Sequence, residues 1–177
     1  MTDVDRERMY STHLRALIIA VLQTEGPILE CGVGIYSTPV LEALAQTTGR
    51  QLVHVEHDSG WAKQIKPQGK LIRIPTANVF DTSPLKLNEK WGVVFLDQGP
   101  TGTERWPWAI AALPITSLVV LHDAEKGSES IYQYRTRILP HVRHWCLDTR
   151  LSPHTMICSN KIDISEWFDG HNGEADK

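Results

Sequence analysis

A chain of 177 residues is long enough for one domain around a single buried core, and the sequence predicts no separate substrate domain. Hydrophobic residues make up 41% and charged residues 22% of the chain, which excludes wholesale disorder and a fibrous protein. The net charge of −3 and the scattered lysines and arginines argue against nucleic acid as the main partner, because such binding needs clustered cations.

Apolar runs and helical patterns alternate along the chain. A helix is predicted over residues 6–22, where apolar side chains recur at helical spacing and Gly26-Pro27 follows. The next predicted elements are, in order, strand 28–32, helix 37–46, strand 51–56, helix 60–65, strand 70–74, strand 92–97, helix 104–113, strand 117–123 and helix 128–139. Strands that are apolar throughout their length suit a parallel sheet with helices on both faces.

The end of the chain has a different pattern. Two strand-like runs, 142–150 and 154–160, are separated only by Leu151-Ser152-Pro153. This connection is too short for a helical crossover and predicts an antiparallel hairpin. Residues 165–177 are polar and contain glycine, so we expect a frayed tail there and a single domain over residues 1–164.

Membrane insertion and disulfides are not expected. The longest apolar stretch, Ala16–Leu22, is far shorter than a bilayer-spanning helix and lacks the cleavage pattern of a signal peptide. We therefore expect a cytoplasmic protein with no membrane partner. The cysteines lie far apart, each in an apolar run, which predicts reduced and buried thiols: Cys31, Cys146 and Cys158.

The stretch ILECGVGIYST, residues 28–38, has the form of a nucleotide-binding loop. Gly32 and Gly34 lack a Cβ and let the backbone turn next to a ligand, and the helix that begins near Ser37 directs free N–H groups to the same place. Glu56 ends the next strand, where its carboxylate can accept the hydroxyl protons of a ribose. These features fit both NAD and S-adenosylmethionine.

Two residues favour S-adenosylmethionine. A dinucleotide loop has a third glycine, where this chain has Ser37. Glu30, two residues before the first glycine, would repel a diphosphate but would suit the ammonium group of a methionine moiety. An NAD-linked oxidoreductase is therefore the less favoured reading.

The motifs LECGVG, HVEHD, WGVVFLDQGP and SLVVLHDAE resemble strand ends of the class I S-adenosylmethionine-dependent methyltransferases, and the resemblance covers residues 10–159. It implies an α/β fold, a Rossmann-like three-layer αβα sandwich. The sheet of that family is mostly parallel and seven-stranded, in the order 3-2-1-4-5-7-6, with strand 7 antiparallel. It also implies S-adenosyl-L-methionine as the cofactor.

The resemblance further implies which residues bind the cofactor. Glu30 would contact the amino group, the two glycines would pass beside the methionine part, and Glu56 would hold the ribose. Asn78 is the candidate for the adenine edge, with Asp81 as the alternative. The full expected set is Glu30, Gly32, Gly34, Ser37, Glu56, His57, Asn78 and Asp97.

Methyl transfer from a sulfonium requires alignment of the acceptor and, for a hydroxyl acceptor, removal of a proton. Asp97, His122 and Asp123 stand near the ends of the fourth and fifth strands and are the candidate catalytic residues, with His122 suited to act as a base. Asp97 and Asp123 also match two metal-binding acids of catechol-type O-methyltransferases. Those enzymes have Asn where this chain has Ala124, which removes one oxygen ligand and leaves Glu125 as the alternative. No metal is expected.

Other residues leave alternatives open. Arg105, Trp106 and Trp108 could pair with and stack on a flat or anionic acceptor, or the indoles could simply pack a helix against the sheet. Tyr10 and His13 could reach the cofactor, or could belong to the core.

No NPPY or DPPY motif follows the fourth strand, which disfavours DNA or RNA bases as acceptors. The leading hypothesis is methyl transfer to a small-molecule acceptor, with oxygen as the default. The alternative is a protein that binds S-adenosylmethionine without transferring methyl. The sequence does not decide whether the chain forms a homo-oligomer.

Overall fold

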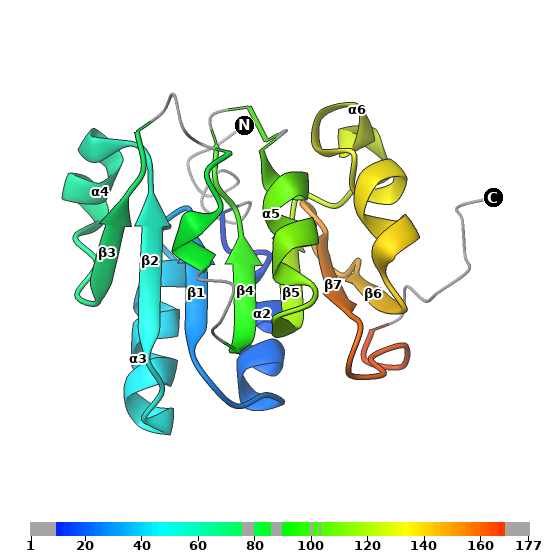
Figure 1. Cartoon of the computed structure of the whole chain (residues 1–177), viewed down its shortest axis with the longest axis horizontal. Coiled ribbons are helices and arrows are strands. Elements are labelled where there is room, and N and C mark those ends of the chain that lie inside the picture. The colour runs from blue at the N-terminus through cyan, green and yellow to red at the C-terminus, as the bar shows by residue number, and fades with distance from the viewer. Residues whose placement is uncertain (1–9, 76–79, 86–89, 100, 103, 169–177) are drawn as a thin grey trace.

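We describe a computed structural model of the chain, which covers residues 10–75, 80–85, 90–99, 101–102 and 104–168. Seven strands form one sheet in the order β3-β2-β1-β4-β5-β7-β6, as predicted (Figure 1). The strands are β1 (Ile28–Cys31), β2 (Leu52–Glu56), β3 (Lys70–Arg73), β4 (Trp91–Leu96), β5 (Thr116–His122), β6 (His144–Asp148) and β7 (Thr155–Ser159). The pairings of β7 with β5 and with β6 are antiparallel, which confirms the terminal hairpin.

Helices cover both faces of the sheet (Figure 1). Among the described residues, the helices of four or more residues are α2 (Leu14–Leu22), α3 (Ser37–Thr48), α4 (Ser59–Ile65), α5 (Arg105–Ala112), α6 (Glu129–Tyr132) and the π-helical turn η4 (Tyr134–Ile138). Single 3₁₀ turns are η2 (Ser83–Leu85), η3 (Lys126–Ser128) and η5 (Leu139–His141). Within the part of the chain that the structure describes, no helix is long and apolar enough to cross a bilayer.

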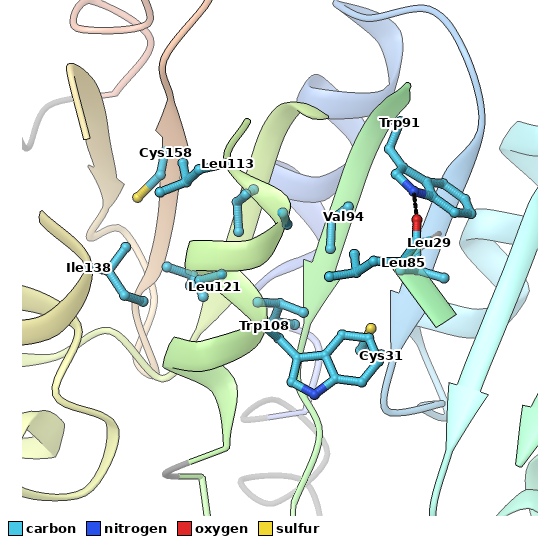
Figure 2. Packing of buried hydrophobic residues seen from close by; sticks show 14 of the residues in the cluster. Leu29, Cys31, Leu85, Trp91, Val94, Trp108, Leu113, Leu121, Ile138 and Cys158 are labelled. Atoms are coloured by element: carbon cyan, nitrogen blue, oxygen red, sulfur yellow. Dashed lines mark hydrogen bonds between the residues drawn. The ribbon is translucent and has the colours of Figure 1, made fainter. Parts of the chain in front are cut away.

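The side-chain alternation of the strands divides the core into two clusters. On one face, α2 and α3 pack on alternate strand residues such as Ile28 of β1 and Phe95 of β4. On the other face, α5 packs through Trp108 over Leu29 and Cys31, and Figure 2 shows this indole pointing toward Cys31. All three cysteines are free and buried, as predicted.

Several predicted elements have different ends from those expected. The helix expected over 6–22 begins at Leu14 in the described residues, after a turn at residues 10–13, and residues 6–9 lie outside the description. In the segment expected to be a frayed tail, Phe168 is buried in the α2 face, and the Arg15 guanidinium lies 4.7 Å from its ring centroid. Phe168 therefore joins the core, with Trp167 packed against it, and the single domain over 1–164 stays a prediction.

The helix predicted over 128–139 is wrong as a continuous element. It breaks at Gln133, which has a left-handed backbone with φ of 56°. The carboxylate of Glu129 accepts hydrogen bonds from the backbone N–H groups of Arg135 and Thr136, at 3.0 and 2.9 Å, and so caps the start of the second segment. The break turns Tyr134 inward, where it is buried against β5.

Candidate active site

A cavity of about 370 Å³ lies at the carboxyl edge of the parallel strands, which is the upper edge of the sheet in Figure 1. Its walls come from the turn before α2, the loop after β1 and the residues that follow β4 and β5. This is the position at which open α/β sheets bind ligands. The three predicted catalytic residues, Asp97, His122 and Asp123, line it together with Gly34, His13 and Arg105.

The loop after β1 passes directly over the end of β4. Gly32 has φ of 89°, and a Cβ on it would lie 2.7 Å from the backbone carbonyl of Asp97. The loop is closed by Thr38, whose hydroxyl accepts from the N–H of Gly34 at 2.9 Å. Ser37 is 1% exposed, and its hydroxyl acts on the buried Glu30 carboxylate. Gly34 lines the cavity, whereas Ser37 lies beneath the loop.

Glu30, which was expected to contact the ammonium group of the cofactor, does not line the cavity. Its side chain is fully buried, because a residue within β1 points toward a face of the sheet and not toward the edge. Glu30 Oε2 accepts from Thr38 Oγ1 at 2.9 Å and lies 2.6 Å from His54 Nδ1. Burial raises the pKa of Glu30, and its role in this geometry is to hold α3 against β1 and β2.

Glu56 is buried at the end of β2 and is tied to the loops around it. Oε1 accepts from the N–H groups of His57 and Asp58, at 2.7 and 2.8 Å, and Oε2 accepts from the N–H of Val33 at 3.1 Å. A carboxylate has about four acceptor positions, so one remains on Oε2. Glu56 and His57 line a second, small hollow of about 10 Å³ beside Gln98.

The structure describes only one of the two residues predicted to contact the edge of the adenine ring. Asn78 lies outside the described residues. The alternative, Asp81, is exposed, and its Oδ1 accepts from the N–H of Ser83 at 2.9 Å.

Arg105 joins the two acids at the cavity floor. Its Nη2 lies 3.0 Å from Asp97 Oδ1, and its Nη1 donates to Asp123 Oδ2 at 3.0 Å. Nη1 also donates to the carbonyl of His122, and Nε donates to the carbonyl of Gln98. The guanidinium, which is 5% exposed, thus spans the ends of β4 and β5. Arg105 was a candidate partner for an anionic acceptor, but its charge is already matched by the carboxylates of Asp97 and Asp123.

The position of the Arg105 guanidinium determines whether Asp97 and Asp123 could share a metal ion. Because Arg105 bridges Asp97 and Asp123, a cation already occupies the position between them that a shared Mg²⁺ would need. Ala124, which replaces the third oxygen ligand, is buried and has no side-chain donor atom. The residues present therefore do not fit a catechol-type metal site, and we derive no step through one.

His122 is held at both ring nitrogens. Nδ1 lies 3.2 Å from Asp97 Oδ1, and Nε2 lies 3.0 Å from Thr12 Oγ1. Burial alone would lower the pKa of His122, but the hydrogen bond to Asp97 and the charges of Asp97 and Asp123 raise it above its ordinary value. For Asp97, burial is outweighed by Arg105 and His122, which bring its pKa down to about 2. The pair therefore favours the charged state of both partners.

His13 lies directly beside this pair. Its ring centroid is 4.7 Å from that of His122, and its side chain is 2% exposed. Burial and the neighbouring charge on His122 lower the pKa of His13 to about 4, so its imidazole is neutral at pH 7. The sequence could not place His13 here, because its separation from His122 depends on how α2 packs on the sheet.

The tryptophans after β4 have packing roles. Trp108 is 1% exposed within the α5 face of the core, which rules out stacking of an acceptor on it. Trp106 packs on the same core, with the Arg137 guanidinium 5.3 Å from its ring centroid. Trp61 does line the cavity, and its Nε1 donates to the carbonyl of Val33 at 2.6 Å.

The two histidines give opposite pH dependences of stability, and we expect maximal stability near neutral pH. The folded-state pKa of His13 is depressed, so stability is lost as pH falls from about 6.5 toward 4, by up to about 3 kcal/mol. The folded-state pKa of His122 is raised, so its contribution is complete below about 6.5 and is lost as pH rises through the folded value. Urea unfolding in chelator-containing buffer, from pH 4 to pH 9, measures the free energy of unfolding on both the acid and the alkaline side.

Matched variants test which histidine causes the loss of stability at acid pH and which causes the loss at alkaline pH. His13→Asn should flatten the acid limb and His122→Asn the alkaline limb, whereas His141→Asn, at an exposed position, should change neither. Parallel profiles for all four proteins would show that these rings do not titrate as described.

The comparisons with known proteins identify the fold. A protein described as a caffeoyl-CoA O-methyltransferase from Staphylococcus aureus is 12% identical, with a TM-score of 0.59 over 84% of this chain and 81% of that one. Human methyltransferase-like protein 13, solved with SAH, is 13% identical, with a TM-score of 0.55 over 85% of each chain. Spermidine synthase from Thermotoga maritima is 14% identical, with a TM-score of 0.59 over 91% of this chain and 62% of that one.

No protein-family model and no curated protein sequence matches the chain. The structural likenesses therefore establish the architecture, which is the Rossmann-like fold of the class I S-adenosylmethionine-dependent methyltransferases. The spermidine synthase has this architecture too, so the reaction must be argued from the site.

Proposed function

We propose that the chain binds S-adenosyl-L-methionine at the carboxyl edge of the sheet and transfers its methyl group to an oxygen of a small-molecule acceptor. One observation carries this proposal: a single cavity joins the glycine loop after β1 to the paired side chains of His122 and Asp97. A methyl donor on the loop and a proton acceptor on β5 would then face the same space.

The loop has features that suit the cofactor. Gly34 leaves backbone exposed to the cavity for the methionine part, and α3 directs its N-terminus toward the loop. Glu56 would hold the ribose through the free acceptor position on Oε2. The hollow beside Glu56 and His57 has room for about one water, so the ribose seat would have to widen when the nucleoside enters.

His122 and Asp97 are the proposed base and its positioning partner. The bound cofactor supplies an electrophilic methyl group on a sulfonium. In its neutral state, with Nδ1–H held by Asp97, His122 would take a proton at Nε2 from an acceptor hydroxyl that replaces Thr12 Oγ1 there. Because Asp97 and Asp123 raise the pKa of His122, this neutral state becomes more populated as pH rises. Arg105 keeps Asp97 ionised and fixed, and Asp123 stabilises the guanidinium.

The remaining walls favour a neutral, apolar acceptor. Tyr10, Ile35, Trp61 and Pro153 line the cavity, and the first two are 55% and 47% exposed at its rim. Arg105 is already paired with two carboxylates, so it offers little attraction to an anionic acceptor. A phenol or an alcohol on an apolar body fits these walls and a histidine base.

A methyl-release assay with labelled S-adenosylmethionine tests this reaction. A panel of phenols, apolar alcohols, carboxylic acids and amines should give turnover with the phenols or alcohols. His122→Asn should lower kcat by about 10²- to 10⁴-fold, because the base is removed, whereas His141→Asn should leave it unchanged. Cofactor binding without transfer to any compound would favour the alternative, a protein that binds S-adenosylmethionine without using it. Turnover that His122→Asn leaves intact would exclude this histidine as the base.

A further inference from the structure

His13 is a buried polar side chain in the wall of the cavity. It is 2% exposed, and neither ring nitrogen has a hydrogen-bond partner among the described residues. A buried polar group left unsatisfied costs about 1–3 kcal/mol, so such a group in a native protein requires an explanation. The ring lines the cavity, so a ligand in the cavity can satisfy it.

Two further metal-ligand side chains lie around the same point. One ligand atom each from His13, Asp97 and His122 lies within 4.8 Å of the other two. Bonds of about 2.0–2.2 Å to a common ion place ligand atoms roughly 3–4 Å apart, which a small inward rotation of the side chains would give. We propose that His13, Asp97 and His122 form a binding site for one divalent transition-metal ion.

The surrounding groups suit this role. Thr12 Oγ1 lies 3.0 Å from His122 Nε2, so a proton on Nε2 can be held there. Nδ1, which lies 3.2 Å from Asp97 Oδ1, would then share the ion with that carboxylate, so metal-bound His122 does not serve as the base proposed above. Arg105 holds the Asp97 carboxylate at 3.0 Å and keeps it in place. Binding of the ion requires a neutral His122, so the ion must displace the proton that the pairing with Asp97 favours. Asp97, Asp123 and Arg105 then sum to one negative charge, which attracts a cation.

The chemistry of the ligands selects the class of ion. Two imidazole nitrogens and one carboxylate oxygen favour zinc and its neighbours in the first transition row over Mg²⁺ or Ca²⁺, which prefer oxygen ligands alone. Three protein ligands leave at least one coordination position, and that position faces the cavity. The site shares Asp97 with the acid pair joined by Arg105, but its other ligands come from the start of α2 and the end of β5.

Metal binding can be measured without any methyl donor, so failure of this proposal and failure of the proposed function are separate results. The purified chain, stripped with a chelator, is titrated with ZnCl₂ by calorimetry and with CoCl₂ by visible absorption. We expect about one equivalent of Zn²⁺ per chain and the d–d bands of a Co²⁺ ion with few ligands, at least one of them nitrogen. His13→Asn should weaken Zn²⁺ binding by about tenfold or more and reduce the Co²⁺ bands.

His141→Asn serves as the matched control, because His141 is an exposed histidine away from the cavity and its loss should change neither measurement. Should His13→Asn not fold, NMR of the wild-type histidine rings answers the question: Zn²⁺ should shift His13 and His122 and leave His141 in place. The absence of Zn²⁺ binding by the wild type, equal affinity in His13→Asn, or shifts confined to other histidines would each overturn the proposal.

Discussion

Arg105→Met is expected to lower the free energy of unfolding by about 3–5 kcal/mol, because it leaves buried charge without its partner. The guanidinium is 5% exposed and bridges Asp97 and Asp123, whose side chains are themselves 25% and 20% exposed. Methionine fills much of the volume but removes the charge and every hydrogen bond that the guanidinium donates. For a chain of this size, each kcal/mol corresponds to about 2–4 °C in Tm. Urea unfolding at pH 7 gives the free energy, and calorimetry gives the Tm.

Three companion variants separate charge from packing. Arg105→Lys should lie between wild type and Arg105→Met, because it keeps the charge and loses the planar fork. Adding Asp97→Asn to Arg105→Met should recover part of the loss, since one uncompensated charge is then gone. Arg143→Met, at an exposed position, should change stability by less than about 0.5 kcal/mol. A decrease in the free energy of unfolding of less than about 1 kcal/mol for Arg105→Met would show that the bridge between Asp97 and Asp123 contributes little to stability.

Gly32→Ala is expected to cost at least about 2 kcal/mol and to abolish tight cofactor binding. A positive φ of 89° disfavours any side chain there, and the new Cβ would lie 2.7 Å from the backbone of Asp97 and Gln98. Relief of that contact must move the loop away from β4, and the cavity wall moves with it. Unfolding and calorimetric titration with S-adenosylhomocysteine measure the two effects.

Two other glycines provide controls for the strain and for the contact. Gly49 also has a positive φ, of 67°, but a Cβ there would meet nothing within 4 Å, so Gly49→Ala should show the backbone strain alone. Gly127→Ala has neither problem and should be nearly neutral. If Gly32→Ala costs no more than Gly49→Ala and binds ligand normally, the close approach of the loop to β4 is not required.

The sheet could be predicted from the sequence because its strands are short apolar runs separated by clear breaks. Val93 to Leu96 and Leu118 to Leu121 are buried on both faces, and such runs suit the centre of a parallel sheet. The hairpin followed from the short connection before β7. Strand identity therefore depended on local pattern, which a sequence displays directly.

The break at Gln133 could not be predicted in the same way. Gln133 is neither Gly nor Asn, the usual residues at a left-handed position, and the pattern from 128 to 139 reads as one helix. The Glu129 side chain supplies the cap that makes two segments possible. A single sequence gives no signal that this carboxylate prefers backbone N–H groups to solvent.

For the candidate site, the sequence predicted where the catalytic candidates lie better than it predicted which side chains contact one another. Asp97, His122 and Asp123 do meet at one edge, because parallel strands bring their carboxyl ends together. The expected contact of Glu30 with the cofactor rested on its distance from Gly32, whereas side-chain alternation in β1 directs its side chain to the α3 face, 2.6 Å from His54 Nδ1. The bridging position of Arg105 depends on the angle of α5 across the sheet, which no local pattern encodes.

Binding of S-adenosylmethionine is the central claim, and calorimetric titration of the wild-type chain tests it most directly. The cofactor and its demethylated product should each bind with about one equivalent per chain, and NAD should give no heat. Glu56→Gln should weaken both by about 1.5–3 kcal/mol through loss of a charge-assisted ribose contact, while Glu166→Gln, at an exposed carboxylate, should bind as the wild type does. Absence of heat with both sulfur compounds, or preferential binding of NAD, would contradict the claim.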